Sequence, residues 1–76
     1  MLAAALEHLV KGIVDHPDEV RIGTHTSPRG EVLEVRVHPD DRGRVIGRGG
    51  RNAKALRTLV SALADGRRVR VDVADD

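Results

Sequence analysis

The stretch RVIGRGGRN, from Arg44 to Asn52, holds the residues whose types and spacing are best suited to chemistry. Its three glycines fall within four positions and create the pattern G-x-x-G from Gly47 to Gly50. Glycine has no Cβ, so its backbone can approach a ligand closely, and an arginine can hold a phosphate with two parallel hydrogen bonds. Together these residues predict a site at which a polyanionic backbone lies against bare peptide groups.

Basic residues are concentrated around the same glycines. Between Arg42 and Arg57 there are six basic residues and no Asp or Glu, which gives this window a charge of +6. The other 7 basic and 12 acidic residues leave −5 on the rest of the chain, so the formal net charge of +1 conceals the asymmetry. The asymmetry predicts one cationic face and an anionic partner.

The composition narrows the ways in which such a partner can be bound. The 76 residues are enough for one domain, predicted to span 1–76, with a modest core of Val, Leu, Ile and Ala. The chain has no Phe, Tyr or Trp, which excludes the base-stacking platforms of RRM and OB-fold proteins. It also has no Cys, which excludes disulfides and zinc-thiolate sites.

Hydrophobic periodicity predicts the elements that must position the glycine loop. Apolar residues recur at helical spacing in two long segments and one short one, and alternate with charged residues in three others. The expected order is a helix over 2–15, a strand over 20–26, a turn over 27–30, a strand around 33–37, a short helix over 40–46, the loop, a helix from 51 to before Gly66, and a strand over 69–73.

This order predicts the fold class. Each strand has one apolar and one charged face, so all three helices must cover the same side of one sheet, giving an α+β two-layer sandwich. The first two strands form an antiparallel hairpin, and the crossover through two helices leaves the second and third strands parallel, so the three-stranded sheet is mixed. In the last helix the predicted buried stripe comprises Ala53, Leu56, Leu59, Val60 and Leu63, and Ile46 is expected to pack beside Leu56.

The pattern G-x-x-G is weak evidence by itself, because eight glycines in a chain of this length produce such a spacing by chance. The alternative to a binding loop is a flexible corner between two helices. The predicted position between helices favours an anion site, since loop N–H groups and the N-terminus of the second helix can then point the same way.

The segment VIGRGGRNAKALRTLV, residues 45–60, resembles the V-I-G-x-x-G core of KH domains. A helix and a strand precede this core, as in the prokaryotic type II arrangement, and the whole chain resembles the KhpA family of small bacterial RNA-binding proteins with a single KH domain. Arg48 and Gly49 stand where that family commonly has a lysine and a bulkier polar residue. Ala53 stands where many KH domains have a branched apolar residue.

The resemblance implies a groove for about four nucleotides of single-stranded RNA, whose backbone is clamped by the loop. It implies phosphate contacts from Gly47, Arg48, Gly49 and Gly50, flanking cations at Arg51, Lys54 and Arg44, and an aliphatic floor for the bases from Val45 and Val37. For Val45, an ordinary core position is an equal alternative. Arg42 and Arg57 are expected on a solvated helix face.

An enzyme is the first rival interpretation. The four histidines are scattered without metal-ligand spacing, neither serine has an evident nearby base, and the Rossmann and Walker glycine patterns are incomplete. We therefore expect no catalytic site, no metal and no cofactor.

A protein-interaction module without RNA binding is the second rival. A small aliphatic core gains from burial against another chain, and we expect a weak homodimer through Thr58, Ser61 and Ala62. The resemblance further implies pairing with a larger KH-containing protein, a role as RNA chaperone or post-transcriptional regulator, and a link to cell-envelope synthesis and cell length.

The expected location is the cytoplasm. Glu7 and His8 interrupt the apolar N-terminal stretch, which lacks the features of a signal peptide, and no apolar run is long enough to span a membrane.

Overall fold

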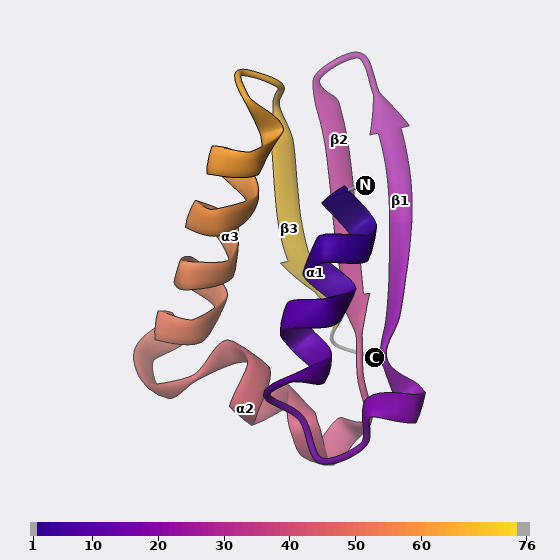
Figure 1. The fold of residues 1–76 in the computed structure, drawn as a ribbon, viewed down its shortest axis with the longest axis vertical. Coiled ribbons are helices and arrows are strands. Elements are labelled where there is room, and N and C mark those ends of the chain that lie inside the picture. Colours follow the sequence, from indigo (N-terminus) through magenta and orange to yellow (C-terminus); the bar gives the residue numbers. More distant parts are fainter. Residues whose placement is uncertain (1, 75–76) are drawn as a thin grey trace.

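The computed structural model describes residues 2–74, so both ends of the predicted 1–76 domain lie outside the described part. The described chain is an α+β fold, as predicted (Figure 1). The main elements in chain order are α1 Leu2–Lys11, β1 Arg21–Ser27, β2 Gly30–Arg36, α2 Arg42–Ile46, α3 Arg51–Ala64 and β3 Val69–Val73. Short 3-10 turns lie at Pro17–Glu19, Pro39–Asp41 and Arg48–Gly50.

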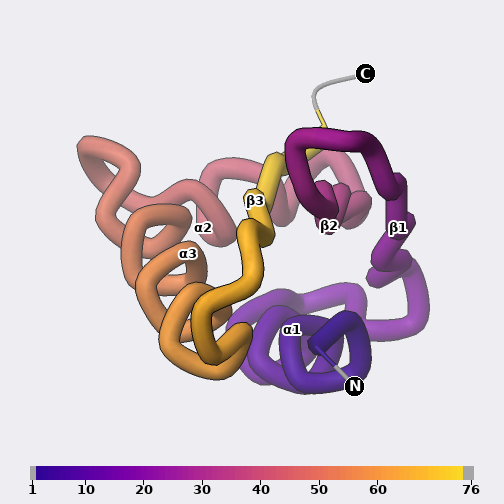
Figure 2. The backbone as a smooth tube through the Cα atoms, turned by 90° about the horizontal axis from the view of Figure 1, so that it is seen from above, coloured from indigo at the N-terminus to yellow at the C-terminus, as the bar shows by residue number. Residues whose placement is uncertain are grey.

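The predicted mixed sheet is confirmed, with strand order β1-β2-β3. β1 pairs antiparallel to β2, and β2 pairs parallel to β3 with Leu33 opposite Val71. α1 and α3 lie on the same side of this sheet, and α2 links the lower end of β2 to the start of α3 (Figures 1 and 2). No helix in the described part is long and apolar enough to cross a membrane.

The core lies between the helices and the inner sheet face. Leu33, Val35 and Val71 point inward at alternate strand positions, which leaves the charged residues between them on the outer face. The helices contribute fully or almost fully buried side chains at helical spacing, namely Leu2, Leu6 and Val10 from α1, Val45 from α2, and Ala53, Leu56, Val60 and Ala64 from α3.

The first helix is shorter than predicted. It ends at Lys11 rather than near Asp15, because the N–H of Gly12 is shared between the carbonyl oxygens of His8 and Leu9 and the chain then turns. Ile13 and Val14 still pack partly buried against the core from the connection that follows. Apolar spacing therefore continued past the end of the helix.

Two predictions about burial are wrong. Leu59 and Leu63 of α3 are 47% and 57% exposed, and Ile46 at the end of α2 is 41% exposed. α3 lies over the edge strand β3 (Figure 2), so the sheet covers only one side of its apolar stripe. The predicted helix over 40–46 is also divided into the 3-10 turn Pro39–Asp41 and the five-residue α2.

The buried carboxylate of Asp41 attaches the start of α2 to the connection after α1. Its oxygens accept hydrogen bonds from the backbone N–H groups of Asp15 and His16, at 3.2 and 3.0 Å, and lie 3.0 Å from Nδ1 of His16. The ring of His16 also stacks on that of His38, with centroids 4.0 Å apart. This contact fixes the position of the helix that leads into the glycine loop.

The same contact shifts the pKa of both partners. The hydrogen bond to Asp41 raises the pKa of His16 above its usual 6.5, although partial burial opposes the shift. Burial alone would raise the pKa of Asp41, but the hydrogen bonds from the His16 side chain and from two backbone N–H groups outweigh it, so that the pKa is lowered below 3.8.

We expect the free energy of unfolding to be highest between roughly pH 4 and pH 6.5, the usual values of the two groups. The contribution of His16 is complete below its unfolded pKa and is lost as the pH rises through its higher folded pKa. The contribution of Asp41 is complete above its unfolded pKa and is lost as the pH falls through its lower folded pKa. Urea denaturation across this pH range measures both limbs.

The matched variants are His16→Gln and His25→Gln, the latter at an exposed position on β1. His16→Gln should flatten the decline in the free energy of unfolding at alkaline pH, whereas His25→Gln should leave that decline unchanged. The interpretation fails if the His16→Gln profile overlays that of the parent above pH 6.

Candidate nucleic-acid interface

Gly47 makes a turn that no other residue fits well. Its φ of 77° and ψ of 167° lie in a region used almost only by glycine. A Cβ built on Gly47 would lie 2.8 Å from the backbone nitrogen of Asn52 and 2.8 Å from its side-chain amide carbon, closer than real Cβ contacts. The first glycine of the G-x-x-G pattern is therefore required by both conformation and space.

Asn52 joins the two sides of the loop. Its side-chain Nδ2 donates a hydrogen bond of 2.7 Å to the carbonyl oxygen of Arg44, which connects the start of α3 to α2. Within the loop the N–H of Gly47 donates to the carbonyl oxygen of Gly43, and that of Gly50 donates to Gly47. Asn52 has no predicted role in the sequence, where its position two residues after the glycines is the only signal.

The other two glycines leave open space. Gly49 and Gly50 have φ values of 65° and 78°, and a Cβ added at either would meet no atom within 4 Å. Gly50 is the N-cap of α3, no side chain caps this end, and the first turn contains no acidic residue. The N–H of Arg51 donates to the carbonyl oxygen of Arg48, and the next N–H groups of α3 lack a capping side chain at the positive end of the helix dipole.

Three exposed cations surround this helix end. Arg48, Arg51 and Lys54 have no carboxylate partner among residues 2–74. Arg44, by contrast, pairs with Asp15 at 3.0 Å. Arg57 is not simply solvated as expected, because its Nε donates to the carbonyl oxygen of Val71 at 3.1 Å. Near the glycines, the positive charge free to meet a ligand therefore comes from the loop and the first turn of α3.

The apolar candidates separate into one core residue and two accessible ones. Val45 is fully buried and belongs to the core, so its side chain does not reach the surface. Ile46, immediately before the loop, is instead 41% exposed, and Val37 is partly buried. In a five-residue helix, neighbouring residues cannot both face the core, which places Ile46 rather than Val45 beside the loop.

This arrangement suits anion binding better than catalysis. Exposed backbone, a helix N-terminus and unpaired cations converge on one surface, which is the geometry that phosphate groups use at helix ends. Within residues 2–74 no group of three His, Cys, Asp or Glu side chains is placed to hold a metal ion. A helix–G-x-x-G–helix corner packed on a mixed sheet, with a helix and a strand before it, defines the class of type II KH domains.

Comparison with known proteins identifies the family. A family model described as "KhpA/KhpB, KH domain" matches residues 3–74, and the chain therefore belongs to the KhpA/KhpB family of KH-domain proteins. The protein named "RNA-binding protein KhpA" from Leifsonia xyli is 79% identical over 76 residues and is covered completely by this chain. No solved structure matches the chain.

More distant relatives carry the same name. The KhpA proteins of Streptomyces coelicolor and Mycobacterium tuberculosis are each 65% identical, over 75 and 71 residues. These alignments cover 99% and 93% of this chain, and 94% and 88% of the respective relatives. The similarity thus extends over nearly the full length of each protein rather than over the glycine loop alone.

Replacing Gly47 with Ala should destabilise the fold by roughly 1–3 kcal/mol, because a Cβ there is strained and collides with Asn52. Gly43 provides the matched control, since it lies in α2 and an added Cβ meets no atom within 4 Å. Gly43→Ala should raise stability by about 0.5–1 kcal/mol. Thermal melts compare the two, and equal effects of both substitutions would contradict the assigned turn.

Proposed function

We propose that this protein binds single-stranded RNA and clamps its phosphate backbone with the Gly47–Gly50 loop. The observation that carries the proposal is the N-terminus of α3, which has no side-chain cap and lies next to cations without carboxylate partners. The name "RNA-binding protein" borne by the relatives supports the same partner. A flexible corner would need neither unpaired cations nor open space at two successive glycines.

Each loop residue has a separate task in this proposal. Gly47 sets the turn. Gly49 and Gly50 let the RNA strand approach the protein backbone, and Arg48 contacts its phosphates directly. Arg51 and Lys54, on the first turn of α3, flank the path. Arg44 adds to the local field but is committed to Asp15, and Val45 supports α2 from inside the core.

The bases would meet aliphatic rather than aromatic side chains. Ile46 and Val37 are the accessible apolar residues that we assign to this floor. Without aromatic rings, stacking energy is small, so phosphate contacts must supply most of the affinity. Binding of that kind favours many RNA sequences, which suits an RNA chaperone or post-transcriptional regulator better than a reader of one sequence.

The loop is tested by changing both Arg48 and Gly49 to Asp. Two negative charges then lie where phosphates must bind, and each like-charge contact at about 4 Å costs on the order of 1 kcal/mol near water. We expect affinity for single-stranded RNA to fall at least about thirtyfold in a fluorescence anisotropy titration. The thermal melt should stay near that of the parent, because the positive φ of Gly49 is one that Asp tolerates.

The matched control changes the same two residues to Asn, which has nearly the shape of Asp without its charge. Like the Asp variant, this variant loses the charge of Arg48 and gains a side chain at residue 49, but it adds no negative charge, so its affinity should fall about three- to tenfold, by the same Coulomb estimate. Parent-like RNA binding by the folded Asp variant would reject the loop as the RNA clamp.

A homodimer is the further assembly that we propose, through the outer face of α3. Ala55, Leu59, Ala62 and Leu63 recur at helical spacing and are all exposed. Ser61, expected in this surface, instead lines a cavity beside β3, and Thr58 donates a hydrogen bond back to the carbonyl oxygen of Lys54. The apolar face also suits a KH module of a larger protein, and this pairing is compatible with RNA binding at the loop.

Leu59→Lys should weaken self-association more than tenfold, because burying a leucine contributes about 1.5–3 kcal/mol. Thr24→Lys, at an exposed position on β1 away from α3, adds the same charge, is the matched control and should sediment like the parent. Sedimentation velocity over a concentration series measures both. A parent that stays monomeric at high concentration would refute the homodimer.

A further inference from the structure

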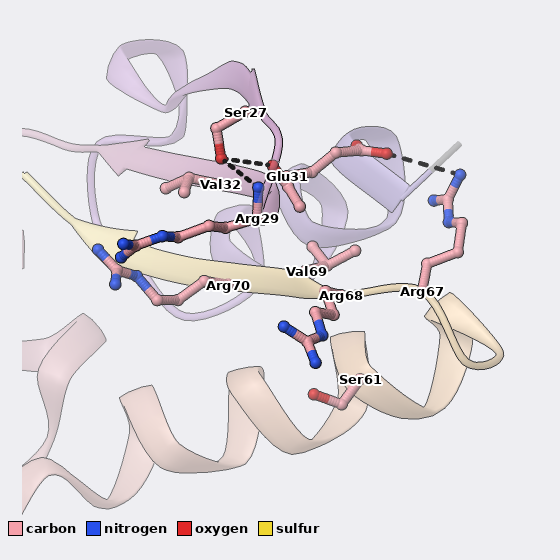
Figure 3. Close-up of a pocket in the computed structure, with 10 residues that line it drawn as sticks. Ser27, Arg29, Glu31, Val32, Ser61, Arg67, Arg68, Val69 and Arg70 are labelled. Carbon is pink, nitrogen blue, oxygen red and sulfur yellow. Dashed lines mark hydrogen bonds and ion pairs between the residues drawn. The ribbon is translucent and has the colours of Figure 1, made fainter.

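A second group of cations lies at the end of the molecule away from the glycine loop. A cavity of about 490 Å³ opens there between the β1–β2 turn, the start of β3 and the last turns of α3 (Figure 3). Four arginines line it, Arg29, Arg67, Arg68 and Arg70, with Glu31 as the single acidic residue of the lining. Only Glu31 opposes these four charges from within the cavity wall.

The two segments that carry these arginines are fixed to each other through their backbones. The N–H of Glu31 donates a hydrogen bond of 2.9 Å to the carbonyl oxygen of Arg68. Gly30 has a φ of 130°, and a Cβ there would collide with that same carbonyl oxygen. The hydroxyl of Ser27 accepts from the N–H of Arg29 and donates to the carbonyl oxygen of Gly30, which closes the turn. The cavity is thus built by local packing and does not depend on flexible side chains alone.

The charges in the cavity are only partly compensated. Arg67 lies 3.7 Å from Glu31, and Arg70 lies 2.9 Å from Asp72. Arg29 and Arg68 have no carboxylate partner within residues 2–74. In Figure 3 the side chains of Arg29 and Arg70 extend in the same direction, and that of Arg68 turns toward Ser61 of α3. Guanidinium groups held together without an anion repel each other, whereas a phosphate offers acceptors to several of them at once.

We propose that this cavity is a second phosphate-binding site, which holds the backbone of the same single-stranded RNA beyond the nucleotides at the glycine loop. The proposal rests on the proposed function, since it extends the path of that RNA. α3 joins the two sites, because its first turn lies at the loop and Ser61 lines the cavity. Its 14 residues measure about 20 Å at 1.5 Å per residue, which is the distance that the RNA must cover between the two sites.

Arg57 marks the path between the two sites. It lies midway along α3, and its hydrogen bond to Val71 turns it toward β3, the strand that borders the cavity. An RNA strand that leaves Lys54 would pass Arg57 before it reaches Arg68. The cations of residues 67–70 lie outside the basic window of the sequence, and the hydrogen bond from Arg57 to Val71 places the last residue of that window beside β3.

The test measures affinity for oligouridylates of increasing length, from about four to about twelve nucleotides. The parent should gain affinity in a step once the strand is long enough to reach the cavity. In the double variant Arg29→Gln, Arg68→Gln the step should disappear. Binding of the tetramer should stay within about twofold of the parent, whereas the dodecamer should bind about tenfold more weakly. The salt dependence for the dodecamer should fall by about 1.4 in slope, as expected for two lost phosphate contacts.

The matched control is the double variant Lys11→Gln, Arg21→Gln, which removes the same charge at the end of α1 and the start of β1. This control variant should keep the stepwise gain in affinity with oligouridylate length. The cavity proposal is overturned if the parent shows no step, if the Arg29→Gln, Arg68→Gln variant keeps it, or if that variant loses equal affinity for every length. In each of these cases the parent protein still binds the tetramer, so the proposed function stands. A parent that binds no length overturns both.

Discussion

The backbone turn at Gly47 is the constraint on which the candidate site depends. Asn52 occupies the space that a Cβ of residue 47 would need, and its side chain then bonds to the carbonyl oxygen of Arg44. α2 and α3 can meet at this angle only because residue 47 is glycine. The same turn leaves the start of α3 without a capping side chain, so a structural requirement and an anion-binding surface have one origin.

The rest of the fold holds this turn in place. α2 has five residues and is too short to be stable alone. Its position comes from Val45 in the core on one side and from the buried Asp41, just before its first residue, on the other. The core is made only of small aliphatic side chains. The buried carboxylate of Asp41 adds directional contacts to this core through three hydrogen bonds, and these contacts help to hold the loop in a precise position.

Local sequence patterns predicted the strands, the sheet topology and the position of the loop, because alternation of apolar residues and turn chemistry act over short distances. These patterns gave wrong predictions where burial depends on contacts between segments that are distant in the sequence. Leu59 follows the helical stripe but lies beyond the edge of the sheet. Ile46 is exposed because its neighbour Val45 occupies the core position instead. The attachment of Asp41 to His16 and the cavity that unites Arg29 with Arg68 join segments far apart in the chain, which no local pattern encodes.

The central claim is that phosphates of single-stranded RNA lie against the backbone N–H groups of the loop and of the first turn of α3. Backbone amide chemical shifts during titration with single-stranded RNA test it most directly, because they report on each N–H separately. The account predicts the largest shifts from Arg48 to Ala53. It is contradicted if these signals stay in place while the largest shifts occur at outer-face sheet residues such as His25 and Glu34.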